Sequence, residues 1–244
     1  MKKILTPILL GLLAVRVAAA DSTSKDDVVA ASKKLGDQPN YSWKENVVVP
    51  DSSPFKPGPT EGKWEKGGDT YFTLSFGDNT TKIYLEGDKS AISDPDGGWQ
   101  SAKEMEADEG PGRFVAAIVG SFKAPAAQAE ELAGTAKELV QDGDAFSAGM
   151  TDEGAKSQFR FGKVTNPKGS VKFWLKDGQL VKYEFKLTGK AEFNGNEFDV
   201  DRDTTVEITD VGATKIDVPA DAKKKLESAP PAATASATNA PAAN

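Results

Sequence analysis

The sequence predicts an α+β fold built on an antiparallel sheet, and three observations lead there. Short strand-like runs between 62 and 88 are each interrupted by Gly, Asn or Asp, as antiparallel connections usually are. Helical patterns then occupy the middle of the chain, at 112–122 and 124–143. From Gly169 to Pro219 the chain returns to β-rich sequence, which places helices between two groups of strands.

The chain is predicted to begin with a helix over 26–35, "DDVVAASKKL". Its residues Val28, Ala31, Ser32 and Leu35 share one face at helical spacing, and Gly36 is a suitable stop. A strand over 41–50 follows and ends at Pro50. A Pro-rich loop over 51–62 then leads to the short strands, "GKWEKG", "DTYFTLSFG" and "TKIYLEGD".

The middle of the chain is predicted to be helical. In the segment 124–143 a single apolar stripe is formed by Leu132, Ala136, Leu139 and Val140. A further short helix is expected over 151–159, and a polar helical turn, "ADAKKKLES", is expected after Pro219.

The segment 171–187, "VKFWLKDGQLVKYEFKL", is predicted to be a β-hairpin. A two-residue turn at Asp177-Gly178 would place Lys and Glu opposite apolar residues, whereas a three-residue loop ending at Gly178 keeps the apolar side chains together. The second pairing sets Phe173 opposite Val181 and Val171 opposite Tyr183. One face would then carry Val171, Phe173, Leu175, Val181, Tyr183, Phe185 and Leu187. Trp174 would lie among lysines on the outer face, so we expect something else to cover it.

The acidic segment 199–210, "DVDRDTTVEITD", has the spacing of a calcium loop, with acids at the first, third, fifth and twelfth places. A calcium loop needs Gly at its sixth place, where this chain has Thr204, and Glu at its twelfth, where it has Asp210. The alternation of β-branched residues from Thr204 to Thr209 favours a strand instead. Its acids would share one solvated face, and we expect no metal site.

The chain contains neither Cys nor His. This composition excludes disulfides, Ser-His-Asp triads, Cys nucleophiles and the usual His/Cys zinc sites. Acid–base chemistry would fall to Asp, Glu, Lys or Tyr. Because the acids lie on predicted strand faces, we expect no catalytic residues, and without a Gly-rich phosphate motif we expect no cofactor.

The two ends of the chain differ from its centre. Residues 1–20 combine a basic start, a short apolar run and small residues before Asp21, which predicts a secretory signal peptide cleaved near Ala20. Residues 228–244 are rich in Ala, Pro, Ser and Thr and are predicted to be a disordered tail. A single domain over 21–227 is expected between them. No later segment reaches membrane-spanning length, so the protein is not expected to span a membrane.

Charge argues against nucleic-acid partners. Loss of residues 1–20 removes Lys2, Lys3 and Arg16 and moves the formal net charge from −7 to −10. Duplex phosphates favour a basic surface, so an acidic exported protein is a poor nucleic-acid binder. We expect a periplasmic or secreted location.

The closing strands resemble those of the periplasmic lipoprotein-carrier superfamily, which includes LolA-like carriers, LolB-like receptors and mycobacterial LppX- and LprG-like lipid-binding proteins. The hairpin "VKFWLKDGQLVKYEFKLTG" and the strand pair "TTVEITDVGATKIDVPADA" carry the resemblance over about 171–219. It implies a curved antiparallel half-barrel with helices covering its concave face. This chain lacks the lipid-modified Cys of the receptor and mycobacterial members, and the functional basic residue of the carriers has no match here.

The resemblance implies an exported, non-enzymatic carrier or binding protein for a lipid, acyl chain or lipoprotein, with an envelope protein as a further candidate partner. The helices near 112–140 would act as the gate. The alternative is a structural or protein-interaction module of the cell envelope whose core is filled by its own side chains. The candidate cavity residues are Phe173, Val181, Tyr183, Phe185, Leu187, Val206 and Ile208.

Overall fold

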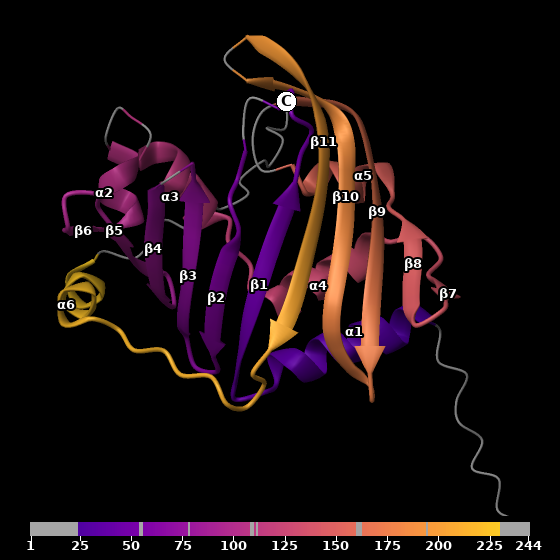
Figure 1. The fold of residues 1–244 in the computed structure, drawn as a ribbon, viewed down its shortest axis with the longest axis horizontal. Helices are drawn as coiled ribbons and strands as arrows, with labels where there is room; N and C mark the ends of the chain where they lie inside the picture. The colour runs from indigo at the N-terminus through magenta and orange to yellow at the C-terminus, as the bar shows by residue number, and fades with distance from the viewer. Residues whose placement is uncertain are drawn as a thin grey trace, which may run out of the picture.

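The computed structural model describes residues 24–229 apart from 54, 55, 78, 108, 109, 111, 160–162 and 194. The predicted signal peptide and all but the first residues of the predicted tail lie outside this part of the chain. The described residues form one open antiparallel sheet of eleven strands, in the order β6-β5-β4-β3-β2-β1-β11-β10-β9-β8-β7 (Figure 1). This curved, unclosed sheet with its helices confirms the predicted α+β half-barrel fold.

The first half of the chain forms one helix and then half of the sheet as a run of neighbouring strands. These elements are α1 (Ser24–Gly36), β1 (Asn40–Val48), β2 (Thr60–Glu65), β3 (Asp69–Phe76), β4 (Asn79–Glu86), β5 (Lys89–Ser93) and β6 (Trp99–Gln100).

The second half adds most of the helices and the long strands that complete the sheet beside β1. These elements are α2 (Ala102–Ala107), α3 (Gly112–Gly120), α4 (Pro125–Thr135), β7 (Val140–Asp142), β8 (Ala145–Gly149), α5 (Asp152–Ser157), β9 (Lys163–Lys176), β10 (Gln179–Phe193), β11 (Asn196–Thr209) and α6 (Ala220–Ser228). None of the helices in the described ranges is long and apolar enough to cross a membrane.

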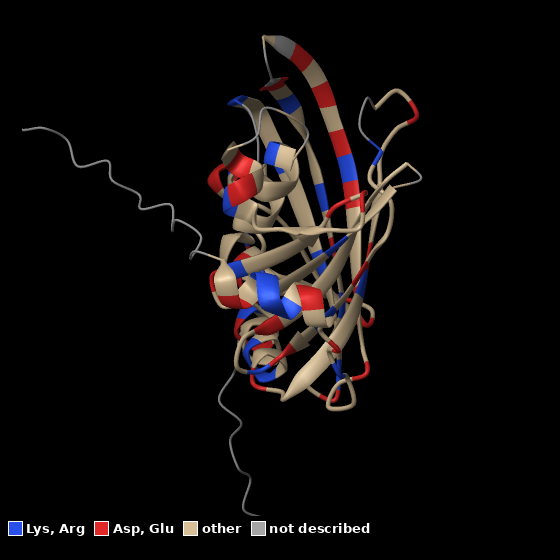
Figure 2. Cartoon of the chain, turned by 90° about the vertical axis from the view of Figure 1, so that its left-hand side faces the viewer, with Lys and Arg blue, Asp and Glu red and all other residues tan. Residues whose placement is uncertain are grey.

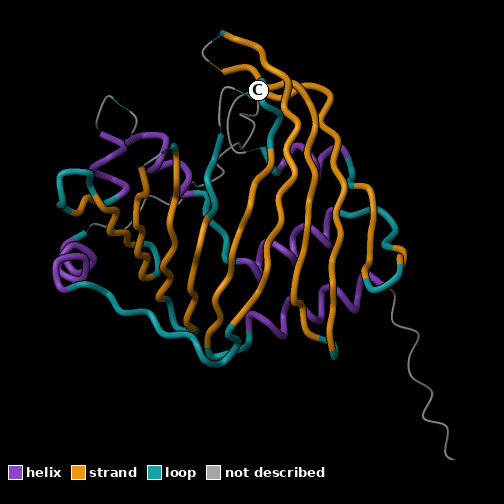
Figure 3. The backbone as a smooth tube through the Cα atoms, in the orientation of Figure 1, coloured by secondary structure: helices purple, strands orange, loops and turns teal. Residues whose placement is uncertain are grey.

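Two groups of helices cover the concave face of the sheet. Helices α1, α4 and α5 lie behind β9–β11, and α2 and α3 lie behind the β3–β5 end (Figures 1 and 3). Figure 2 shows the sheet from the side, with most helices gathered against one face and charged residues alternating with uncharged ones along the tall β10–β11 hairpin. The main hydrophobic core lies between the two layers, where inward side chains of the strands meet the apolar faces of the helices.

Helix α6 covers the opposite, convex face at the β4–β5 end of the sheet. Its Ala222 and Leu226 pack with Tyr84 and Ala91 in a second buried cluster. Side chains alternate between the two faces of a strand, so Tyr84 and Ala91 point away from Ile83 and Ile92, which belong to the main core. The last helix therefore shields aromatic residues that would otherwise be exposed on the outside of the sheet.

The helix predicted over 124–143 is wrong in its second half. Helix α4 ends at Thr135, whose hydroxyl donates to the Leu132 carbonyl, and Ala136 is extended with ψ 144°. The backbone N–H of Lys137 donates to Gly149, and the chain then enters β7. Leu139 is still buried, but Val140 is 59% exposed, so the apolar period continued past the true end of the helix.

The predicted pairing of the 171–187 hairpin is also wrong, although the hairpin itself is confirmed. Lys176 pairs with Gln179 around a two-residue turn in which Asp177 and Gly178 have φ of 53° and 69°. Positive φ at both positions is typical of a type I′ turn. A β-bulge between Leu180 and Lys182 then shifts the register, so that Phe173 pairs with Tyr183 and Val171 with Phe185.

The remaining helices and the acidic strand agree with prediction. The buried face of α1 consists of Val28, Ala31, Ser32 and Leu35. The acidic segment lies in β11, which pairs with β10 and β1 and so excludes the helix–loop–helix geometry of a calcium loop. The chain also contains α2 and β5–β8, which the sequence patterns did not reveal.

Candidate ligand-binding site

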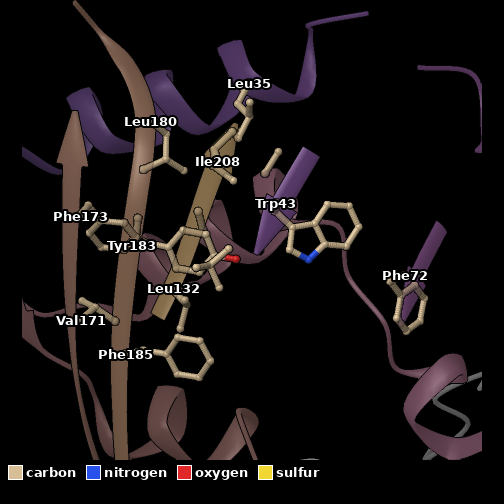
Figure 4. Packing of buried hydrophobic residues seen from close by; sticks show 14 of the residues in the cluster. Leu35, Trp43, Phe72, Leu132, Val171, Phe173, Leu180, Tyr183, Phe185 and Ile208 are labelled. Carbon is tan, nitrogen blue, oxygen red and sulfur yellow. The ribbon is translucent and has the colours of Figure 1, made fainter. Parts of the chain in front are cut away.

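The predicted cavity residues lie on β10 and β11 and on the neighbouring β9, in the middle of the concave face. Phe173, Tyr183, Leu187 and Val206 are completely shielded from solvent, and Phe185 and Ile208 are 5% and 9% exposed. Figure 4 shows several of these side chains pointing to the same side of the sheet, toward α1 and α4. The inward face of β9–β11 is thus a continuous apolar surface, which we call the floor.

Val181 does not share this arrangement. As the extra residue of the bulge it has no partner on β9, and it is half-buried. Leu180 takes the place predicted for Val181: it pairs with Leu175 and is 1% exposed. A bulge inserts one residue and so exchanges the faces of the side chains beyond it, which is why the apolar face continues from Leu180 to Tyr183.

Helix α4 forms the roof over the floor, and most of its buried residues are small. The buried set is Pro125, Ala126, Gln128, Ala129, Leu132 and Ala133. Two tyrosine hydroxyls of the sheet form hydrogen bonds to this helix: Tyr183 donates to Gln128 Oε1 at 2.6 Å, and Tyr41 accepts from the Ala126 N–H at 3.4 Å. Burial raises the pKa of Tyr41 well above its usual range, so the hydroxyl remains protonated at neutral pH.

Between the two helix groups, the concave face is covered by rings. We call Tyr41, Trp43, Trp64, Phe72 and Phe122 the aromatic seam. Phe122 lies in the connection from α3 to α4, and its ring centroid is 4.4 Å from that of Phe72 and 6.0 Å from that of Trp43. Tyr41 stacks on Trp64 at 5.1 Å.

Gly62 makes the aromatic seam possible. It pairs with Trp43 of β1 on one side and with Phe72 of β3 on the other. A Cβ atom at Gly62 would lie 2.0 Å from the Trp43 ring, which shows that the indole rests directly on the glycine backbone. The missing side chain on β2 therefore creates the space that Trp43 fills.

Polar groups enter the concave face near the middle of β11. Its inward positions run from Ile208 and Val206 to Thr204 and Arg202, which pair with Phe185 and Leu187 of β10. The guanidinium carbon of Arg202 lies 5.8 Å from the centre of the Phe185 ring. Glu45 of β1, in register with Val206, faces the same side. Sequence reasoning missed Arg202, although its alternation with the outward acids Asp201 and Asp203 was a usable signal.

The two best-formed hollows described in the structure are open grooves, and neither is lined by the buried floor residues. The larger, of about 680 Å³, lies where α1 meets the β7–β8 and β9–β10 turns, and Val181 and Trp174 line it. Trp174 is covered there by Lys182 and Lys172, whose Nζ atoms lie 4.5 and 5.2 Å from its ring centre. The buried floor residues belong to one hydrophobic cluster with Leu132 and the buried alanines of α4.

No protein-family model and no curated protein matches the chain. Among solved structures, it is similar to LprF from Mycobacterium bovis (11% identity, TM-score 0.44, covering 81% of this chain and 96% of that one). It is also similar to lipoprotein LppX from Mycobacterium tuberculosis, with 10% identity and a TM-score of 0.45, covering 80% of this chain and 100% of that one. A third similar structure is a LolA superfamily protein from Nitrosomonas europaea, with 9% identity and a TM-score of 0.33, covering 80% of this chain and 96% of that one. LppX and the LolA superfamily are among the proteins that the sequence resemblance named.

Proposed function

We propose that the protein binds one apolar chain, such as the acyl chain of a lipid or lipoprotein, between the floor and α4, and that it carries this ligand without chemical change. The observation that carries the proposal is the continuous inward apolar surface of β9–β11 under a roof of small side chains. Hydrocarbon and aromatic side chains dominate this surface, a lining suited to removing a chain from water.

The composition of the roof favours opening. Each alanine of α4 buries little apolar area, so separating Ala126, Ala129 and Ala133 from the floor costs less than separating larger residues would. The chain also changes direction at the connection between α3 and α4, where Phe122 closes the seam. Movement of this connection with α4 would uncover the floor, which agrees with the predicted gate near 112–140.

The free energy gained by burying an acyl chain is comparable to the cost of separating α4 from the floor. An acyl chain that buries about ten methylene groups gains roughly 8 kcal/mol at about 0.8 kcal/mol per group. Opening would disrupt the Tyr183–Gln128 and Tyr41–Ala126 hydrogen bonds, at about 1 kcal/mol net each, together with the apolar contacts of Leu132, Phe122 and the alanines of α4. A ligand of this length could therefore hold the open state.

The proposed setting follows from the sequence. A signal peptide over 1–20 would export the mature domain to a periplasm or beyond, where a carrier takes its ligand from one envelope component and delivers it to another. An envelope protein would then be its delivery partner.

The second candidate is a structural or interaction module with a solid core. It is favoured by the complete burial of Phe173, Tyr183 and Leu187 within the main hydrophobic core. Such a protein would use its outer surface for contact and would never uncover the floor.

Native mass spectrometry of the mature protein purified without detergent separates the two. A carrier is expected to retain lipid, or after solvent stripping to take up a fluorescent fatty acid at one molecule per chain. The outward variant Trp174→Phe is the control and should bind equally well, because its ring lies under Lys182 on the other face. Absence of both retained lipid and saturable uptake would decide for the solid module.

A further inference from the structure

The polar end of the floor stands out because one of its groups is buried without a partner. Thr204 is 2% exposed, and its hydroxyl oxygen has no hydrogen-bond partner among the described residues. Leaving a buried hydroxyl unpaired is unfavourable, whereas Val would fill the same volume at no such cost. The Thr204 hydroxyl therefore has hydrogen-bonding capacity that none of the described residues uses.

The neighbouring inward residue on β11 supplies a positive charge. Strand alternation places Arg202 two positions from Thr204 on the same face, opposite Leu187, while Asp201 and Asp203 point outward to Lys186. The guanidinium lies over Phe185, itself a floor residue, so the charge borders directly on the apolar surface. A planar guanidinium with several N–H donors matches carboxylate and phosphate oxygens.

From this juxtaposition we infer that the ligand is an anionic amphiphile, whose carboxylate or phosphate is bound by Arg202 and Thr204 while its chain lies along Phe185, Tyr183 and Val206. This inference rests on the proposed function and specifies its ligand class. The Thr204 hydroxyl donates to one anionic oxygen, and Arg202 donates to the others. Glu45, which faces the same side, opposes the anion and so limits the affinity.

The test compares ligands that share a chain and differ in the head. Hexadecanoate, hexadecyl phosphate and hexadecanol compete against a bound fluorescent fatty alcohol on the full mature protein. The wild type is expected to bind both anions at least tenfold more tightly than the alcohol. Arg202→Gln should abolish this preference while alcohol binding stays within about twofold, and Glu45→Gln should strengthen anion binding.

Thr204→Val provides a second measurement that does not depend on Arg202. It should lower anion affinity several-fold, and without ligand it should melt at the same temperature as the wild type or higher, because it removes an unpaired hydroxyl. Lys186→Gln is the matched control: it removes the same charge from the opposite face, where Lys186 pairs with Asp201 and Asp203, and should leave the preference intact.

The outcomes distinguish failure of the anionic subsite from failure of the carrier function. Equal binding of acids and alcohol by the wild type, or a preference that survives Arg202→Gln or is lost equally in Lys186→Gln, overturns the anionic subsite and leaves the carrier proposal standing. Binding of neither acid nor alcohol overturns the carrier proposal itself.

Discussion

The phenolic oxygen of Tyr183 lies 2.6 Å from Oε1 of Gln128, and this buried hydrogen bond joins the middle of β10 to α4. Removing the donor in Tyr183→Phe leaves the amide oxygen of Gln128 buried without that partner. We expect the free energy of unfolding to fall by about 1–3 kcal/mol, measured by urea denaturation.

The double variant Tyr183→Phe with Gln128→Met is the control for this bond. Replacing both partners by apolar groups of similar shape should recover most of the loss, with a coupling energy of about 0.5–3 kcal/mol in the double-mutant cycle. Additive single-variant effects would show that the bond does not hold the roof to the floor.

The bulge predicts opposite outcomes for two adjacent residues. Leu180 is 1% exposed and pairs with Leu175, so Leu180→Ala should cost about 2–5 kcal/mol of stability. Val181 is the half-buried extra residue, so Val181→Ala should cost less than about 1.5 kcal/mol. Thermal denaturation of the two variants side by side measures this difference. A larger loss at Val181 would mean that the hairpin follows the three-residue loop after all.

This hairpin shows how far the sequence could determine the fold. Alternation correctly placed Phe173, Tyr183 and Phe185 on one face, because a buried sheet face requires it whatever the turn. The turn type could not be chosen in the same way. A type I′ turn followed by a bulge and a three-residue loop both keep the apolar residues together. They differ in whether Leu180 or Val181 is buried and in whether Tyr183 or Val181 lies opposite Phe173.

The other features that could not be predicted from the sequence have similar physical causes. The stripe Leu132, Ala136, Leu139 continued beyond α4 because a turn followed by an edge strand can bury the same residues as a helix. Thr204 and Arg202 could be assigned to a strand, but their position beside an apolar floor depends on the register in which β11 pairs with Phe185 and Leu187 of β10. The need for Gly at position 62 could not be predicted either, because it arises only when β1 and β2 pair and the Trp43 ring lies on Gly62.

Helix α2 begins with a capping box that should make stability depend on pH. The Ser101 N–H donates to Glu104 at 2.7 Å, the Glu104 N–H donates to the Ser101 hydroxyl at 3.2 Å, and Lys225 of α6 donates to both carboxylate oxygens at 2.9 Å. The Ser101 N–H, and then the Lys225 ammonium, hold the pKa of Glu104 below its usual range. The motif "SAKE" was a signal for this helix in the sequence.

A lowered folded-state pKa stabilises the protein above the unfolded value of about 4.3, and this contribution is lost as the pH falls through the folded value. Glu104→Gln should therefore be less stable than the wild type at pH 7, with the difference shrinking as the pH falls below the unfolded value. Urea denaturation across this range measures it. Glu106→Gln, which makes the same charge change at an exposed site of α2, should show no comparable trend, and a matching trend there would assign the effect to net charge.

Phe122 is the position where the two proposed functions differ most clearly. Its half-buried ring stacks on Phe72 and lies against Trp43, at the connection that would have to move for α4 to leave the floor. Phe122→Ala should cost about 1–3 kcal/mol of stability in either case, because apolar contacts are lost. For a carrier it should also speed the uptake of a fluorescent fatty acid by several-fold, since the closed state loses contacts that the open state does not have.

Phe146→Ala is the control for this prediction. Phe146 is another half-buried ring, which packs against the core from β8, and its removal should reduce stability without speeding uptake. Stopped-flow uptake and thermal denaturation of both variants, each compared with the wild type, measure these effects. If the two variants lose similar stability and neither changes uptake, the aromatic seam is ordinary core packing and the gate does not lie there.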